Sequence, residues 1–239
     1  MSLADHIPSF APADMAALAF LLVGWLVFDF VVEHPPAGRP SVSLLMQEFR
    51  REWLRQFVTR QPRIFDASIL DSLRQGISFF ASACMIAIGG GVALIGNTSH
   101  LQGLAGDLID LNGQTQIWQI KILVIVLFLT NAMLKFVWSH RLFGYCAILM
   151  AAVPNDADDR AAYARAAQAA AINIHAARNF NRGLRSVYFA LGALGWLLGP
   201  AALAITTAMT LFVSWRREFA SQSRKVLLAH PSPPADLLP

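Results

Sequence analysis

The sequence predicts an all-α integral membrane protein, built as a four-helix bundle with amphipathic helices on its cytoplasmic side. Apolar residues make up 56% of the 239 residues and charged residues only 14%, whereas a soluble domain is roughly 45–50% apolar and about 25% charged. The apolar residues also gather into runs of the length that a bilayer-spanning helix needs, ~17–25 residues. This balance argues against a disordered chain, a disulfide-stapled secreted module and a typical cytosolic enzyme.

Four apolar runs are the predicted membrane spans. They cover residues 15–32, 76–95, 117–137 and 187–213. Each is expected to be a helix, because a backbone in lipid must satisfy its hydrogen bonds internally. We expect one membrane domain over residues 1–225 and a disordered, proline-rich tail over 226–239. The first run is expected to be retained, because residues 1–14 lack the basic region of a signal peptide.

Basic residues are confined to alternate connections between these runs. Residues 33–75 carry seven arginines and residues 138–186 carry six, whereas residues 1–14 and 96–116 carry no lysine or arginine. Loops rich in lysine and arginine stay on the cytoplasmic side of a membrane. The sequence therefore predicts a multi-pass protein of the inner (plasma) membrane with its N-terminus outside.

The end of the chain does not fit this pattern. Arg216, Arg217, Arg224 and Lys225 follow the fourth run, although four crossings would place them outside. That run also contains Gly199-Pro200 at its middle, and a proline inside a helix kinks or breaks it. We expect a single span kinked at this proline. The alternative is a re-entrant hairpin, which would return the tail to the cytoplasm.

Two further segments are predicted to form helices on the cytoplasmic side. In residues 42–57, Leu45, Phe49 and Trp53 recur at helical spacing and the arginines fall largely on the opposite face. This pattern is typical of a helix lying in the interface on anionic lipid, with packing under the bundle as the alternative. Residues 158–182 are rich in alanine, the best helix former. Their alanine face favours packing on the bundle itself, with docking of a partner as the alternative.

Ionisable residues near the cytoplasmic ends of the spans are candidate functional groups, because charges inside a membrane are costly. Asp29 and Lys135 fall at matching depths, and Glu33 and Arg141 fall just below them, so two ion pairs are predicted. Lys121, near the outer end, is expected to extend its ammonium group toward water. The candidate polar cluster at the cytoplasmic membrane face comprises Asp29, Glu33, Lys135, His140, Arg141, Arg178, Asn181, Arg182 and Arg185.

The arginines of this cluster share one helical face. Arg178, Arg182 and Arg185 are spaced by four and three residues. Such a face could hold lipid phosphates, a small anionic ligand, or carboxylates such as Asp29 and Glu33. Anchoring of the span by its positive charge is the simpler interpretation.

No catalytic residue, cofactor or metal site is predicted. His34, His140 and His175 fall on the cytoplasmic side, without a spacing typical of metal ligands. Cys84 and Cys146 are expected to be small buried residues. The sequence contains no nucleophile, nucleotide-binding or zinc-protease motif, and no nucleic-acid-binding motif.

The segment that leads into the fourth run has a distinctive order of residues. It reads Arg178-Asn179-Phe180-Asn181-Arg182-Gly183-Leu184-Arg185, then Tyr188-Phe189-Ala190-Leu191, Trp196 and Gly199-Pro200. This order resembles a signature of a bacterial and plant membrane-protein family, catalogued as domain of unknown function 599. Trp53 and its neighbouring arginines, Arg74, and Lys135 to Arg141 are similar too. The resemblance covers most of residues 15–220; it implies a multi-pass membrane protein and brings no catalytic residues.

Three functions are consistent with these features. The first is a non-enzymatic accessory or scaffold component of a membrane complex, which the two cytoplasmic helices favour. The second is a small homo-oligomeric channel or transporter, with Asp29, Lys135 and the arginine face lining its inner mouth. The third is an enzyme acting on lipid headgroups, with His140 or His175 as the acid–base group. The expected partners are the bilayer, anionic lipid, and a membrane protein or further copies of the chain, but not nucleic acid.

Overall fold

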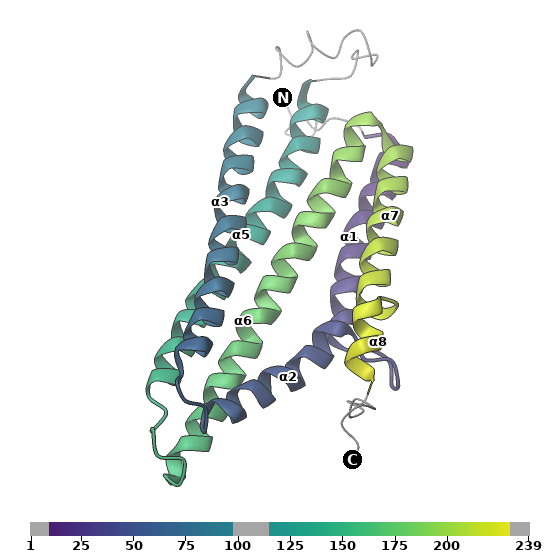
Figure 1. Cartoon of the computed structure of the whole chain (residues 1–239). Helices are drawn as coiled ribbons and strands as arrows, with labels where there is room; N and C mark the ends of the chain where they lie inside the picture. The colour runs from purple at the N-terminus through teal and green to yellow at the C-terminus, as the bar shows by residue number, and fades with distance from the viewer. Residues whose placement is uncertain (1–9, 98–114, 230–239) are drawn as a thin grey trace.

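The computed structural model describes residues 10–97 and 115–229, and every regular element in these residues is a helix. The all-α prediction is therefore confirmed for this part of the chain. Five long helices run side by side, and α2 crosses the bundle at one end (Figure 1). The elements are α1 (Pro12–Glu33), α2 (Val42–Phe57), α3 (Ile64–Gly96), α5 (Thr115–Ala151), α6 (Arg160–Ala193), the short 3-10 helix η2 (Leu194–Leu198), α7 (Pro200–Phe219) and α8 (Gln222–Leu228).

Three of these helices, α1, α3 and α5, are long and apolar enough to cross a membrane, which indicates a membrane protein. They contain the first three predicted runs. α5 has 37 residues and therefore measures about 55 Å at ~1.5 Å per residue, well above the ~30 Å of bilayer hydrocarbon. The bundle therefore extends beyond the thickness of a bilayer core.

The fourth predicted run does not form one span. α6 ends at Ala193, and Gly199 adopts φ +121°, a conformation that favours glycine. Pro200 then begins α7 at a first-turn position, where a helix needs no backbone N–H donor. α7 runs back beside α6 and α1 (Figure 1). The single kinked span is therefore wrong. The described residues form a bundle of five long helices rather than four, and α7 forms a hairpin with the C-terminal part of α6.

Glycines allow α6 and α7 to approach each other closely near the hairpin turn. A Cβ atom on Gly192 would lie 2.8 Å from Thr210 Oγ1, and one on Gly195 would lie 2.9 Å from the Ala202 carbonyl oxygen. The Thr206 hydroxyl donates to the Gly192 carbonyl at 2.7 Å. The hairpin is therefore held by backbone proximity and a hydrogen bond between its two helices.

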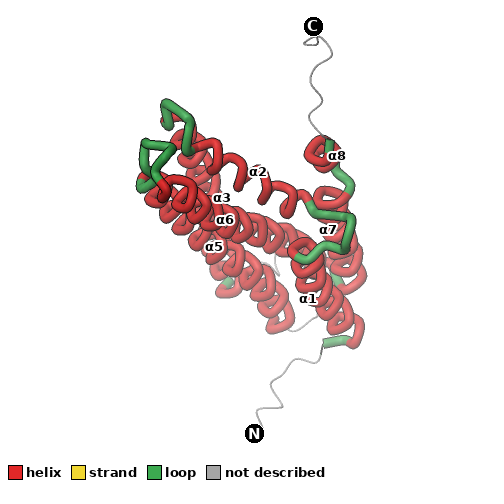
Figure 2. The backbone as a smooth tube through the Cα atoms, turned by 90° about the horizontal axis from the view of Figure 1, so that it is seen from below, coloured by secondary structure: helices red, strands yellow, loops and turns green. Residues whose placement is uncertain are grey.

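The hairpin brings the basic end of α7 back to the α1–α2 connection. Arg224 Nε donates to the Pro40 carbonyl at 3.0 Å, and Glu218 contacts Ser43. Viewed from below, α2 crosses the end of the bundle and reaches α7 (Figure 2). The basic residues that follow the fourth run therefore no longer conflict with the charge pattern of the loops. They lie at the same end of the bundle as the arginines of α2 and α6. Only the start of the predicted tail, in α8, is described; residues from 230 onward, like 98–114, lie outside the described residues.

α2 packs directly on α6 and contacts the start of α3. Leu54 and Phe57 are buried in a core that includes Ala162 and Ala166 of α6. The Trp53 indole donates to the carboxylate of Asp66, which is fully buried. The alanine face of α6 thus packs within the protein's own bundle, as expected from its composition.

The hairpin predicts which residues share a side of the membrane. Single cysteines replacing Arg39 and Ala220 should react with a membrane-impermeant maleimide from one side, and a cysteine replacing Ala13 from the other. The reason is that α7 returns the chain to the end where α1 finishes. The buried Cys84 and Cys146 should give little background. Labelling of Ala220→Cys together with Ala13→Cys would instead support the single kinked span.

The close approach at Gly195 predicts a specific loss of stability. Gly195→Ala should lower the free energy of unfolding by about 1–3 kcal/mol through overpacking against α7. Gly90→Ala is the matched control, because a Cβ atom there meets nothing within 4 Å, and alanine favours a helix over glycine by ~1 kcal/mol. Thermal unfolding in detergent measures both. Equal midpoints for the two variants would contradict the packing described here.

Candidate functional site at the basic end of the bundle

An arginine–carboxylate network joins the end of α1 to the middle of α6. Asp29 and Glu33 lie one turn apart on α1, and Arg178, Arg182 and Arg185 line the facing side of α6. Arg185 Nη2 is 2.6 Å from Asp29 Oδ1 and 3.2 Å from Glu33 Oε1. Arg178 Nε is 2.8 Å from Glu33 Oε2, and Arg182 Nε is 3.3 Å from Asp29 Oδ2. Of the options open from the sequence, the arginine face binds these two carboxylates.

The centre of this network is shielded from solvent. The side chains of Arg185 and Glu33 are 5% and 8% exposed, whereas that of Asp29 is 25% exposed. Charges in such a setting need partners, because an unpaired buried charge loses its hydration without compensation. Two carboxylates and three guanidinium groups leave an excess of one positive charge. The network therefore fastens α1 to α6 and keeps the site basic.

Four members of the predicted cluster lie outside this network: Lys135, His140, Arg141 and Asn181. Asp29 pairs with Arg182 and Arg185, so the predicted ion pair with Lys135 is not formed. Lys135 is still near enough to interact electrostatically with these three charges. The predicted pair of Glu33 and Arg141 is also wrong. Arg141 instead donates to the Tyr145 hydroxyl and lies over the Trp138 ring, 5.9 Å from its centroid.

The remaining predicted side chains also lie apart from the network. His140 is half-buried on α5. Lys121 does not reach toward water as expected: it is buried, with its ammonium 5.7 Å from the centroid of the Trp196 ring.

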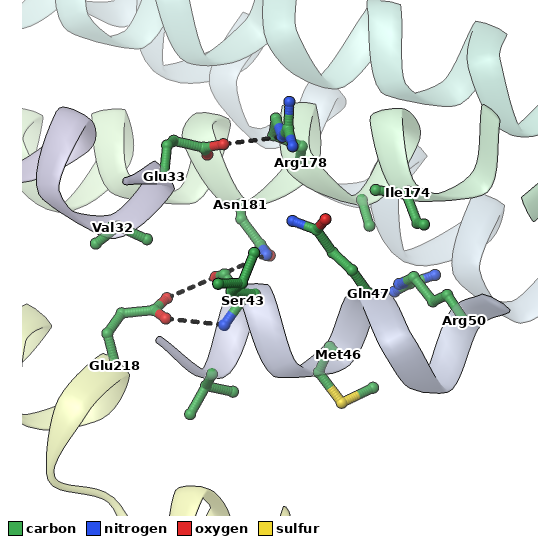
Figure 3. Close-up of a pocket in the computed structure, with 13 residues that line it drawn as sticks. Val32, Glu33, Ser43, Met46, Gln47, Arg50, Ile174, Arg178, Asn181 and Glu218 are labelled. Carbon is green, nitrogen blue, oxygen red and sulfur yellow. Dashed lines mark hydrogen bonds and ion pairs between the residues drawn. The ribbon is translucent and has the colours of Figure 1, made fainter. Parts of the chain in front are cut away.

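A pocket of about 240 Å³ lies beside the network, between α2, α6 and the end of α7 (Figure 3). Asn181 of α6 donates to Ser43 Oγ at 3.3 Å. The carboxylate of Glu218 accepts hydrogen bonds from the Ser43 backbone N–H at 3.1 Å and its hydroxyl at 2.9 Å. A carboxylate at the first turn of a helix is stabilised by the helix dipole. Asn181, Ser43 and Glu218 thus connect three helices at one point.

Arg50 contributes a further positive charge to this pocket. It donates to the fully buried Asn173 and forms no ion pair with any described carboxylate. Burial lowers the pKa of its guanidinium, but arginine stays charged in proteins. The pocket therefore presents both amide and cationic donors.

Ser43, Arg50 and Glu218 were not predicted as members of the site. Arg50 precedes the buried Leu54 and Phe57 by four and seven residues, so helical spacing places it on their face, and this signal was present in the sequence. Glu218 could not be found in that way. A single fourth span would have placed it at the opposite end of the bundle.

A larger groove of about 540 Å³ lies between α2 and the alanine-rich half of α6. Its floor is formed mainly by alanine, and its margins carry basic and polar side chains. Ala167 and Ala171 are exposed there, so the groove has small side chains at its base. The lining residues are Gln47, Arg51, Arg55, Tyr163, Ala166, Ala167, Ala170, Ala171, Ile174, His175 and Arg178.

Potential metal ligands do not gather in the part of the chain that the structure describes. Residues 10–97 and 115–229 hold no group of three histidine, cysteine or acidic side chains placed to bind an ion. His34 stacks on Phe30, and His175 is exposed in the groove. Cys84 and Cys146 are buried, free thiols.

A protein family model matches most of the chain. The family model described as a protein of unknown function, DUF599, matches residues 16–223, which include every residue of the network and of the pocket. The resemblance seen in the sequence is therefore confirmed. No curated protein and no solved structure matches the chain.

The network predicts a marked difference between two arginines of the predicted cluster. Arg185→Ala should lower the free energy of unfolding by roughly 1–3 kcal/mol, because it removes the hydrogen bonds to Asp29 and Glu33 at the shielded centre of the network. Arg141→Ala should change it by less than about 0.5 kcal/mol, since that side chain is exposed. Unfolding in detergent, followed by tryptophan fluorescence, would measure both. Similar losses for the two variants would contradict the assignment of Arg185 as the centre.

Proposed function

Because the chain belongs to the DUF599 family of proteins of unknown function, its function must be inferred from its site, and we propose a non-enzymatic accessory or scaffold component of a membrane complex. In this proposal the protein is multi-pass in the inner membrane, with its N-terminus outside and its basic end in the cytoplasm. The arginine-bearing parts of α2, α6 and α7 adjoin the end of α1, since Arg178 contacts Glu33 and Glu218 contacts Ser43. This supports that orientation.

The groove between α2 and α6 is the observation that carries this proposal. Alanine at its base permits close approach of another backbone, as small residues do at helix contacts. Arg51 and Arg55 at its margins pair with Glu48 and Glu52 of the same helix in exposed ion pairs, which are weak and can exchange for acidic side chains of a partner. We therefore propose that the groove binds an acidic helical segment of a membrane-protein partner.

The transporter alternative receives less support. A transport site at the inner mouth would need Asp29 or Glu33 free to bind and release its cargo. Three guanidinium groups already hold these two carboxylates, which favours a fastening role. The lipid-headgroup enzyme has one favourable observation, since His175 lines the groove beside Arg51 and Arg178. No hydrogen bond in the described residues joins its ring to a serine or a carboxylate that could complete an acid–base pair.

Filling the groove between α2 and α6 should abolish binding of the partner protein. The protein would be extracted from native membranes in mild detergent, and its particle mass and co-purifying chains would be measured by mass spectrometry. We expect a stoichiometric partner with the wild-type chain and its loss with Ala171→Trp, because the indole would occupy the space above the alanines.

Gln168→Trp is the matched control, since Gln168 is exposed on α6 but does not line the groove. It should retain the partner, and Arg51→Glu should weaken binding several-fold. A partner that stays bound to Ala171→Trp would overturn the assignment of the groove. A particle that contains only copies of this chain would favour the homo-oligomeric alternative.

A further inference from the structure

A second groove opens between α6 and α7 on the outer surface of the bundle. It has a volume of about 290 Å³, and Leu191, Met209 and Val213 line it together with Tyr188 and Arg217. The three apolar side chains are each about half exposed or more, at 59%, 61% and 48%. The groove is thus an apolar surface with a tyrosine and an arginine at one end.

The shape of this groove follows from the packing of the hairpin. Near the turn, Gly192 and Gly195 bring α6 against Thr210 and Thr206 of α7. Toward the basic end, the larger Tyr188 takes the place of glycine on this face of α6 and lines the groove. Met209 and Arg217 are two turns apart on α7, about 12 Å at ~1.5 Å per residue, which is close to the ~15 Å of hydrocarbon in one leaflet.

The polar end of the groove carries a cation without a carboxylate partner. Arg217 Nη1 donates to the Tyr188 hydroxyl at 2.8 Å, and the guanidinium lies over the same ring, 5.5 Å from its centroid. Arg217 forms no ion pair with any acidic residue that the structure describes. Its remaining donors are available to an anion.

A smaller cavity of about 110 Å³ continues from this end into the bundle and reaches Arg185. The Arg185 side chain is 5% exposed, and its Nη1 atom is buried without a hydrogen-bond partner. Glu218 also lines the cavity, but its two carboxylate oxygens already accept hydrogen bonds from Ser43. Asp29, beyond Arg185, is held by arginines. Arg185 and Arg217 against Glu218 give the lining of this cavity a net positive charge, which favours an anionic ligand.

We propose that the groove between α6 and α7 binds one phospholipid of the cytoplasmic leaflet. Its phosphate lies against Arg217, Tyr188 and the unpartnered side of Arg185, and one acyl chain lies along Leu191, Met209 and Val213. Guanidinium groups bind phosphate through paired hydrogen bonds, and the apolar side chains match a lipid tail. A lipid with net negative charge, such as phosphatidylglycerol, is preferred over zwitterionic phosphatidylcholine.

Photo-crosslinking tests this site directly. The full chain would be placed in nanodiscs that contain phosphatidylglycerol with a diazirine on its acyl chain, and the linked residues would be located by mass spectrometry. We expect crosslinks at the apolar lining of the groove. Arg217→Gln should reduce their yield several-fold, and Val213→Trp should abolish them by filling the groove.

Two matched variants serve as controls. Arg216→Gln removes the neighbouring arginine, and Ile205→Trp adds an indole at an exposed position of α7; neither residue lines the groove. Both should crosslink like the wild type, and excess inorganic phosphate should leave the yield unchanged. Equal losses in Arg216→Gln and Arg217→Gln would overturn the proposal, as would full competition by inorganic phosphate. The groove for the partner protein is a different surface, so either proposal can fail without the other.

Discussion

The reversal of the chain at Gly199 and Pro200 determines most of what surrounds the site. It returns α7 along α6 and α1, so that Glu218 reaches the first turn of α2 and Arg217 reaches Tyr188. Without this return, the pocket beside Asn181 would lack one wall, and the groove between α6 and α7 would not exist. The backbone conformation of Gly199, with φ +121°, makes the turn accessible to glycine in particular.

The arginine–carboxylate network stabilises this arrangement of helices by holding α1 against α6. Asp29 and Glu33 lie near the end of an apolar helix, where a charge needs a partner. Arg178, Arg182 and Arg185 supply it from α6; Arg178 also lines the pocket beside Asn181, and Arg185 lines the cavity of about 110 Å³. In the proposed lipid site Arg185 has two roles, because Nε and Nη2 bind the carboxylates of α1 whereas Nη1 has no hydrogen-bond partner.

The basic end offers two surfaces with different chemistry. The groove between α2 and α6 has small side chains at its base and arginines at its margins, which suits a polypeptide with acidic residues. The groove between α6 and α7 has exposed apolar side chains and a single arginine at one end, which suits a lipid.

Local information was sufficient for much of this structure. The apolar runs determined α1, α3 and α5, because length and hydropathy are properties of each segment alone. The spacing of Arg178, Arg182 and Arg185 likewise placed them on one helical face. Arg50 was also within reach, since its spacing from Leu54 and Phe57 places it on the buried face of α2.

The partners of each charge were decided only by the tertiary structure. Matching depths in two helices do not specify which helices are neighbours, so depth alone pairs Asp29 and Glu33 with Lys135 and Arg141 rather than with the arginines of α6. The direction of α7 likewise depends on tertiary contacts. A glycine–proline pair permits both a kink and a reversal, and contacts of α7 with α6 and α1 select the reversal. The sequence by itself determined which segments are apolar helices and where positive charge accumulates. Only packing decided which helices adjoin, because adjacency depends on contacts between residues far apart in the chain.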